Sequence, residues 1–260
     1  MPELPDVETF RDLFERTSLG RDIADAEVRS PEMLEDADPE ALVSALRGSS
    51  FGEAARHGKW LLARLESGPW LGLHFGMSGR LVFLDDGDEP AHTRLLVRFA
   101  DGTALAYDCV RKLGHLALVD APEELVEAHR LGPDALSLAS RELERARGRR
   151  GTIKGRLLDQ GVVAGIGNVY ADEILFQARL HPATRVDELD EERRRRLAGA
   201  VRRVLRTATD RDADPGAFPA GWLTPDREEG APCPRCGGTV IRTRVAGRST
   251  YLCPACQQAP

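Results

Sequence analysis

Apolar residues near the start of the chain recur every three or four positions, the spacing of one helix face. They are Val7, Phe10, Leu13 and Phe14. Pro5 stands at the start of this stretch and Gly20 follows its end, and these residue types favour the start and the end of a helix. The pattern therefore predicts an amphipathic helix that begins directly behind Pro2.

The next part of the chain carries short apolar-rich segments separated by glycine and aspartate, a pattern typical of strands and turns. The segments are 51–65, 70–84, 93–99 and 103–118. The runs Asp85-Asp86-Gly87-Asp88 and Asp101-Gly102 are typical of hairpin turns. We therefore expect residues 22–118 to form an antiparallel sandwich with an ordinary apolar core.

Near residue 120 the pattern changes to that of helices. We expect helices at 122–125, 153–160, 169–176 and 187–205. The last of these has an apolar stripe, and its four consecutive arginines at 193–196 fall mostly on the opposite, solvated face. Residues 207–232 are rich in Asp, Pro and Gly and are expected to form a loop.

Charge changes this picture. The chain has 42 acidic and 36 basic residues, a net charge of −6, which argues weakly against a nucleic-acid binder. The charge is segregated, however, because residues 21–50 hold eight acids while residues 233–260 hold four arginines and no acid. One face is therefore suited to an anion. Without a long apolar run or a leader, we expect a cytoplasmic protein with no membrane contact.

Four of the five cysteines form two C-x2-C pairs. They are Cys233, Cys236, Cys253 and Cys256. In a cytoplasmic protein this spacing predicts one structural Zn²⁺ with four thiolate ligands, and the alternative of disulfides is rare there. The spacer is expected to form a hairpin whose arginines, Arg242, Arg244 and Arg248, suit phosphate contact. A plain zinc ribbon explains the same residues, and Cys109 is interpreted as a small buried hydrophobe.

Gly165-Ile166-Gly167-Asn168 lies between two predicted helices. Glycines at a helix entrance allow backbone N–H groups to hold an anion. Asn168 is suited to cap the helix, to bind a phosphate, or both. A plain tight turn is the alternative interpretation.

The chain end offers a nucleophile. If Met1 is removed, Pro2 presents a secondary amine that titrates near pH ~8, and a neutral amine can form a Schiff base with a carbonyl-like carbon. Glu3 beside it is suited to proton transfer. Alternatively, Pro2 only permits processing and Pro5 only starts a helix.

Taken together and in this order, the motifs resemble the formamidopyrimidine-DNA glycosylase and endonuclease VIII family of base-excision repair enzymes, and more closely its first branch. The resemblance covers essentially the whole chain. Its segments are Pro2-Glu3-Leu4-Pro5-Asp6-Val7-Glu8, Arg56-His57-Gly58-Lys59-Trp60, His74-Phe75-Gly76-Met77-Ser78-Gly79, residues 157–173, Gly247-Arg248-Ser249-Thr250-Tyr251 and the four paired cysteines.

The resemblance implies an α+β fold with three parts. Residues 1–120 would form a two-layer antiparallel β-sandwich with flanking helices, which is the catalytic domain. Residues 121–228 would form an all-helical domain with a helix-two-turn-helix element, and residues 229–260 a β-hairpin zinc finger. The implied partner is double-stranded DNA with a damaged base or an abasic site. A monomer associated with the nucleoid of a prokaryote is also implied.

The resemblance further implies a role for each matching residue. Pro2 would attack C1′ of the damaged nucleotide, Glu3 would protonate the opening sugar, and the Schiff base would allow β- and δ-elimination to nick the strand. Lys59, Lys154, Asn168 and Arg248 would grip phosphates. The base must leave the stack, and Met77, Arg111 and Leu113 would fill the gap.

Three departures bear on which base is removed. The void-filling loop reads Cys109-Val110-Arg111-Lys112-Leu113-Gly114 where 8-oxoguanine enzymes usually have Asp-Pro-Arg-Arg-Phe-Gly. Asp6 stands where glutamate is usual, and residues 207–232 lack the usual Gly-rich capping pattern. We expect oxidised purines as substrates, with an endonuclease VIII-like preference for oxidised pyrimidines as the alternative. A non-catalytic binder of damaged DNA is a further alternative, although it has no reason to keep Pro2, Glu3 and Lys59 together.

Overall fold

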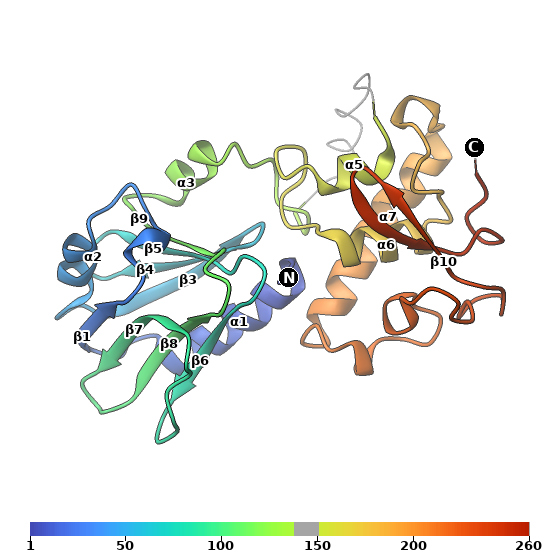
Figure 1. Cartoon of the computed structure of the whole chain (residues 1–260). Helices are drawn as coiled ribbons and strands as arrows, with labels where there is room; N and C mark the ends of the chain where they lie inside the picture. Colours follow the sequence, from blue (N-terminus) through green and yellow to red (C-terminus); the bar gives the residue numbers. More distant parts are fainter. Residues whose placement is uncertain (138–150, 260) are drawn as a thin grey trace. The chain divides into compact units, whose positions relative to one another are not determined.

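The computed structural model describes residues 1–137 and 151–259 (Figure 1). The chain forms two compact units. The first comprises Met1–Pro2 and Asp6–His129, and the second comprises Glu3–Pro5 and Arg130–Pro260. Helix α1 (Leu4–Ser18) confirms the predicted N-terminal helix, and its first two residues belong to the second unit.

The first unit contains two sheets, with strand orders β1-β7-β8-β6 and β2-β9-β5-β4-β3. All neighbouring strands are antiparallel except the short pair β2 and β9. The strands are β1 (Ile23–Val28), β2 (Leu34–Glu35), β3 (Phe51–His57), β4 (Trp60–Leu65), β5 (Trp70–His74), β6 (Gly79–Leu84), β7 (Thr93–Phe99), β8 (Ala104–Cys109) and β9 (His115–Val119). Helices η1 (Pro31–Met33), α2 (Pro39–Leu46) and α3 (Pro122–Ala128) complete the unit.

The apolar face of α1 is part of this unit's core. Val7 and Phe14 are fully buried with side chains from both sheets. Phe14 meets Phe51 edge-on with ring centroids 4.9 Å apart, and Phe10 packs on Phe75 at 4.5 Å. The helical spacing seen in the sequence is therefore the spacing of one buried face.

Three of the four predicted strand segments are in fact pairs of strands. The chain turns at Gly58-Lys59 between β3 and β4, at 75–78 between β5 and β6, and at 110–114 between β8 and β9. Gly58 has a positive φ of 59°, which glycine adopts at little cost. Sequence patterns missed these turns because apolar residues flank each of them closely. Each turn carries residues of the matching family motifs.

The two predicted hairpin turns have different outcomes. Asp101-Gly102 joins β7 to its antiparallel neighbour β8, so this prediction is confirmed. The prediction for Asp85–Asp88 is wrong, because β8 lies between β6 and β7 and the segment crosses over it. Turn residues mark a change of direction but not which strands pair.

The division of the chain differs by one helix from the predicted boundary at residue 120. Leu125 of α3 is buried, and its Cδ1 lies 2.8 Å from the position that a Cβ on Gly72 of β5 would occupy. Because α3 packs on this sheet, it belongs to the first unit. The sequence pattern shows that a helix begins at Pro122 but not which core it joins.

The second unit packs helices around a separate core. The helices are α5 (Ile153–Leu158), α6 (Asn168–Gln177), α7 (Glu191–Thr209) and the short helices η2 (Val186–Glu188), η3 (Pro215–Ala217) and η4 (Thr224–Asp226). The predicted stripe of α7 is buried against α6. Strands β10 (Ile241–Val245) and β11 (Arg248–Leu252) form the predicted hairpin. A small cluster around Phe176, Leu223 and Val240 packs the cysteine-bearing loops on this unit.

Across residues 1–137 and 151–259, none of the helices is both long enough and apolar enough to cross a membrane.

Candidate active site and metal centre

Glu3 is anchored at the N-terminal end of helix α6. Its Oε2 accepts hydrogen bonds from the backbone N–H groups of Gly167 (2.8 Å) and Tyr170 (3.1 Å), and its Oε1 accepts one from Val169 (2.8 Å). The side chain is only 2 % exposed. The positive end of the helix dipole stabilises a carboxylate there. Glu3, and with it the start of the chain, is therefore held in one place.

The two glycines of the 165–168 turn are explained by this anchoring. A Cβ on Gly167 would lie 2.3 Å from the Glu3 carboxyl carbon, and a Cβ on Gly165 would lie 2.5 Å from Leu4 Cδ1. The Leu4 N–H also donates to the Gly165 carbonyl at 3.0 Å. The loop holds an anion, as the sequence predicted, and the anion is the chain's own carboxylate.

Pro2 directly precedes this anchor and is partly exposed, and Met1 before it is 56 % exposed. While Met1 is present, the Pro2 nitrogen lies in the peptide bond with Met1. Removal of Met1 would convert that nitrogen into the secondary amine. Its position is fixed by Glu3 next in the chain.

Lys59 lies in the two-residue turn between β3 and β4. Arg56, on β3, donates from Nη1 to the Gly58 carbonyl (2.8 Å) and from Nε to Glu8 Oε1 (2.7 Å). Burial would raise the pKa of Glu8, but the guanidinium groups of Arg56 and Arg11 outweigh it and hold that pKa below its usual value. An ionised Glu8 thus fixes Arg56, which supports the turn that carries Lys59.

The three expected void-filling residues lie on neighbouring loops of the first unit. Met77 is 46 % exposed and Leu113 is 51 % exposed. Arg111 Nη1 lies 3.6 Å from Met77 Sδ. A Cβ on Gly76, where φ is +55°, would lie 2.1 Å from the Leu113 carbonyl oxygen. The structure thus brings the two loops together and leaves their apolar tips in solvent.

Sequence patterns did not predict a group of packed aromatic rings at the end of β5. His74 packs on Trp60 with ring centroids 5.1 Å apart, and His115 lies 5.6 Å from His74. Burial, with the positive charges of His115 and Lys59, lowers the pKa of His74 to about 3. His74 is therefore neutral at physiological pH. The sequence places it in a family motif, but nothing in the spacing shows its partners.

Lys154 lies in a different environment from the one that we expected. The side chain is fully buried, and Nζ donates to Asp172 Oδ1 (2.6 Å), Thr250 Oγ1 (2.8 Å) and the Ser249 carbonyl (3.1 Å). Burial lowers its pKa, and the negative charge of Asp172 offsets this only in part. A lysine has three N–H donors, so in this arrangement none is left for a DNA phosphate. Nζ instead supports strand β11.

Asn168 supports the same strand. It is the first residue of α6, and its side chain makes no capping bond, since the cap position is Gly167. Its Nδ2 donates to the Ser249 carbonyl at 3.0 Å. Lys154 and Asn168 therefore meet at one carbonyl, directly beside Arg248.

Asp172 accepts hydrogen bonds from Lys154, Arg227 and Tyr251, and no sequence pattern predicted this role. It is fully buried and accepts from Lys154 Nζ with Oδ1. Its Oδ2 accepts from Arg227 Nε (3.0 Å) and Nη2 (2.8 Å) and from the Tyr251 N–H (3.1 Å). Arg227 also stacks on the Tyr251 ring with Cζ 4.5 Å from the centroid. One carboxylate thus ties α5, α6, the loop after η4 and the hairpin together.

Arg248 begins strand β11 at the hairpin tip and is exposed. Among residues 1–137 and 151–259 its guanidinium group has no hydrogen-bond or ion-pair partner. A charged group on a rigid hairpin with unused donors is suited to bind a phosphate oxygen.

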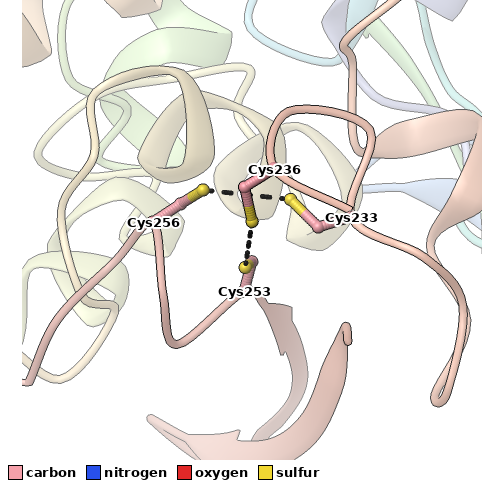
Figure 2. A group of neighbouring side chains, drawn as sticks. All are labelled: Cys233, Cys236, Cys253 and Cys256. Carbon is pink, nitrogen blue, oxygen red and sulfur yellow. Dashed lines mark hydrogen bonds between the residues drawn. The ribbon is translucent and has the colours of Figure 1, made fainter. Parts of the chain in front are cut away.

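The four paired cysteines converge, as Figure 2 shows. All four sulfur atoms lie within 4.8 Å of one another, and the pairs Cys236–Cys253 and Cys233–Cys256 are 3.6 and 3.9 Å apart. Tetrahedral zinc with Zn–S bonds of about 2.3 Å requires S···S distances of about 3.8 Å. Burial and the neighbouring thiols raise the pKa of Cys256 to about 12. A bound cation would stabilise the thiolate form and so counter both causes. Cys109 is buried elsewhere, in the core of the first unit, as predicted.

Comparison with known proteins identifies three consecutive matches. Residues 1–116 match the formamidopyrimidine-DNA glycosylase N-terminal domain, residues 131–217 its H2TH domain, and residues 230–259 a zinc finger found in FPG and IleRS. Two similar curated proteins, from Heliobacterium modesticaldum and Alkalilimnicola ehrlichii, are each named formamidopyrimidine-DNA glycosylase. Each is 38 % identical over 99 % of this chain and all of its own length.

Solved structures of Fpg are also similar to this chain over nearly its whole length. Lactococcus lactis Fpg bound to DNA with an abasic site superposes with a TM-score of 0.88 at 29 % identity. The same enzyme bound to DNA containing N7-benzyl-Fapy-dG gives 0.89 at 30 % identity. Each comparison covers 99 % of this chain and all of the solved chain.

Proposed function

The chain belongs to the formamidopyrimidine-DNA glycosylase family, and on this premise we propose that it removes oxidised bases from DNA and nicks the strand at the resulting abasic site. The observation that carries the proposal is the anchoring of the start of the chain on residues 165–170. Glu3 accepts three hydrogen bonds from backbone N–H groups there, and the Leu4 N–H donates a fourth to the Gly165 carbonyl. A binder that performs no chemistry has no need of a chain end held so firmly.

Pro2 is the nucleophile in this proposal. After removal of Met1, its nitrogen attacks C1′ of the flipped nucleotide, and the bond from C1′ to the base breaks. The departing base takes a proton from solvent. The Glu3 carboxylate takes the proton that the Pro2 nitrogen loses after the attack and passes it to the ring oxygen as the sugar opens, which leaves an iminium between Pro2 and C1′. β-Elimination then removes the C2′ proton and expels the 3′ phosphate, and δ-elimination removes the C4′ proton and expels the 5′ phosphate, which nicks the strand.

Lys59 and Arg248 contact DNA phosphates in the proposed complex. Lys59 is carried by a turn that Arg56 and Glu8 support. Arg248 is carried by a hairpin that Lys154, Asn168 and Asp172 support. We assign Lys154 and Asn168 to positioning Arg248, because both donate to the Ser249 carbonyl beside it.

Zn²⁺ fits the four-cysteine site by its sulfur distances and by the chemistry of four thiolates. Four protein ligands leave no open position, so the ion would have a structural role only. Cys233, Cys236, Cys253 and Cys256 would hold it and thereby fix the loops on either side of the hairpin.

Met77, Arg111 and Leu113 would fill the gap in the duplex when the damaged base leaves it. Met77 and Leu113 offer exposed apolar tips for this purpose. We propose oxidised purines, such as 8-oxoguanine and formamidopyrimidines, as the preferred bases. The enzyme would act as a monomer in the cytoplasm, at the nucleoid, where its substrate lies.

The test is incubation of purified protein with duplexes that carry 8-oxoguanine, a dihydropyrimidine, an abasic site or no lesion, with borohydride added. We expect covalent trapping on the abasic and 8-oxoguanine duplexes and none on the undamaged one. Trapping on the dihydropyrimidine alone, among the base lesions, would overturn the purine preference. No trapping on any duplex, with Met1 shown by intact mass to be absent, would overturn the lyase function.

A further inference from the structure

The second unit contains a pocket of about 470 Å³ that the proposed reaction does not use. The start of α7, the loop after α6 and the two cysteine-bearing loops line it. Four arginines contribute, namely Arg179, Arg193, Arg196 and Arg235, and no Asp or Glu is among the described lining residues. The volume lies within the range of small-molecule sites. The hairpin residues around Arg244 line a different pocket.

Two of the arginines are held in place by the protein. Arg235 donates to the Phe176 carbonyl (2.9 Å) and to Gln177 Oε1 (3.1 Å), and its Cζ lies 4.1 Å from the Phe176 ring centroid. Arg196 donates from Nε to the Ala178 carbonyl (2.7 Å). These acceptors are uncharged, so they orient the guanidinium groups without neutralising them. Such preorganisation lowers the entropy lost when a ligand binds.

Arg179 and His181 complete the lining. Arg179 is exposed and adopts a positive φ of 52°, which is uncommon for a residue other than glycine. Its side chain has no hydrogen-bond or ion-pair partner in the described part of the chain. His181 Nδ1 accepts the Ala183 N–H (3.2 Å), and this assigns the ring hydrogen to Nε2. The pocket therefore offers hydrogen-bond donors of two kinds.

The nearby cysteines do not use up this positive charge. Zn²⁺ with four thiolates has a formal charge of about −2, and four guanidinium groups exceed it. Glu192 lies 3.8 Å from Arg196 and Asp190 lies 3.7 Å from Arg193. These carboxylates are 84 % and 61 % exposed and lie outside the lining, and pairs so exposed to water contribute little.

We infer that this pocket binds a phosphate group, with Arg179, Arg193 and Arg235 as its principal ligands. Guanidinium groups match phosphate oxygens in geometry and charge, and arginine clusters are a recurrent means of phosphate recognition. The phosphate can belong to a free nucleotide or pyrophosphate, or to a DNA backbone. The chemistry of recognition is the same in both.

The first arm of the test titrates the full-length, zinc-loaded protein with pyrophosphate by calorimetry. We expect saturable binding that Arg179→Ala and Arg193→Ala each weaken about tenfold. The matched control is Arg195→Ala, because Arg195 is on the same helix but is 74 % exposed and pairs with Glu191 outside the pocket. Absence of saturable binding, or equal weakening in the control, would overturn the proposal.

The second arm identifies the source of the phosphate. The same variants are compared for affinity to an undamaged duplex over a range of salt concentrations. If the backbone supplies the phosphate, Arg179→Ala and Arg193→Ala will flatten the salt slope by about one unit each. An unchanged slope, together with pyrophosphate binding, assigns the pocket to a free ligand. Thermal unfolding of each variant checks that the fold and the zinc site are intact.

Discussion

The two units of this protein hold their candidate site residues in different ways. The first unit presents its site residues on exposed turns between strands, and many of its ion pairs, such as Lys112–Glu32, lie in solvent, with the Arg56–Glu8 pair as a buried exception. The second unit completely encloses three charged side chains, Lys154, Asp172 and Glu173. Exposed turns can change their residues without loss of the fold, whereas an enclosed ionic network cannot. We therefore expect the exposed turns of the first unit, rather than the enclosed network, to read the base.

The departures from the family pattern agree with this difference. The altered loop 109–114 belongs to the first unit and is exposed, while the 157–173 segment, which holds Asp172 and anchors Glu3, matches the family closely. We therefore expect changes in the exposed loop 109–114 to alter base preference, and changes in the enclosed network of the second unit to alter stability and DNA affinity.

The largest loss of activity is expected from a change at the chain end, where Glu3 is anchored in the second unit. In Pro2→Gln, a bulky second residue should prevent removal of Met1 and displace the amine by one residue, about 3.5 Å. We expect nicking of an abasic duplex to fall at least about 10³-fold, since reacting atoms must lie within about 3.5 Å. Affinity for the duplex should be almost unchanged. Nicking within tenfold of the parent protein would refute the role of Pro2.

Asp172→Asn tests whether the enclosed network contributes more to the free energy of unfolding than an exposed ion pair does. Breaking it leaves Lys154 and Arg227 partly unpaired inside the protein, which should lower the free energy of unfolding by about 3–5 kcal/mol. The matched change in the first unit is Asp25→Asn, whose pair with Arg47 is about half exposed on both sides, and it should leave the free energy of unfolding almost unchanged, because water screens so exposed a pair. Equal losses in chemical denaturation would contradict the comparison.

A positioning role for Asp172 also predicts an effect on DNA binding that mere loss of stability does not. Below the unfolding transition, Asp172→Asn should raise the KM for nicking while kcat falls less, because the hairpin carrying Arg248 is no longer fixed. Asp172→Glu, which keeps the charge, should restore part of the affinity. A variant that binds DNA normally while folded would show that the network is only structural.

Removal of zinc tests whether the four-cysteine site stabilises the hairpin that carries Arg248. Chelation should unfold residues 233–260 selectively and lower DNA affinity at least about 100-fold, because the metal supplies the folding energy of so short a segment. Cys109→Ala is the control and should leave one zinc per chain by metal analysis. Hairpin signals in NMR spectra that survive chelation would refute a structural metal.

Arg248→Ala should have a smaller effect, since it removes one phosphate contact and leaves the network intact. We expect about a tenfold loss of affinity for every duplex and a salt slope flatter by about one unit. A loss confined to one lesion would contradict a phosphate contact and would move base reading into the second unit.

The effect that is smallest at neutral pH is in the first unit and grows only as the pH falls. The pKa of His74 is lowered to about 3 in the folded protein, against about 6.5 when unfolded. Between these values the unfolded chain binds more protons, so stability should fall as pH falls, by at most about 1.4 kcal/mol per pH unit. His74→Gln should reduce this slope, and the exposed His92→Gln should not. Equal slopes in both variants would contradict a buried, neutral His74.

Sequence patterns predicted the local features of the molecule and missed the contacts between residues far apart in the sequence. Helix α1 and the stripe of α7 follow from periodicity, and the cysteine pairs from spacing alone. The partners of Asp172 lie 18, 55 and 79 residues away, and no periodicity relates positions so far apart. For the same reason the glycines of the 165–168 turn predicted an anion-binding loop, but not that the anion is Glu3.

The most direct test of the account maps the covalent adduct that borohydride traps on an abasic duplex. The chain has three lysines, Lys59, Lys112 and Lys154, so only these and the terminal amine can form the bond. Peptide mass spectrometry should place the adduct on Pro2 of protein that lacks Met1. An adduct on any of the three lysines would contradict the proposal that the anchored chain end carries the chemistry.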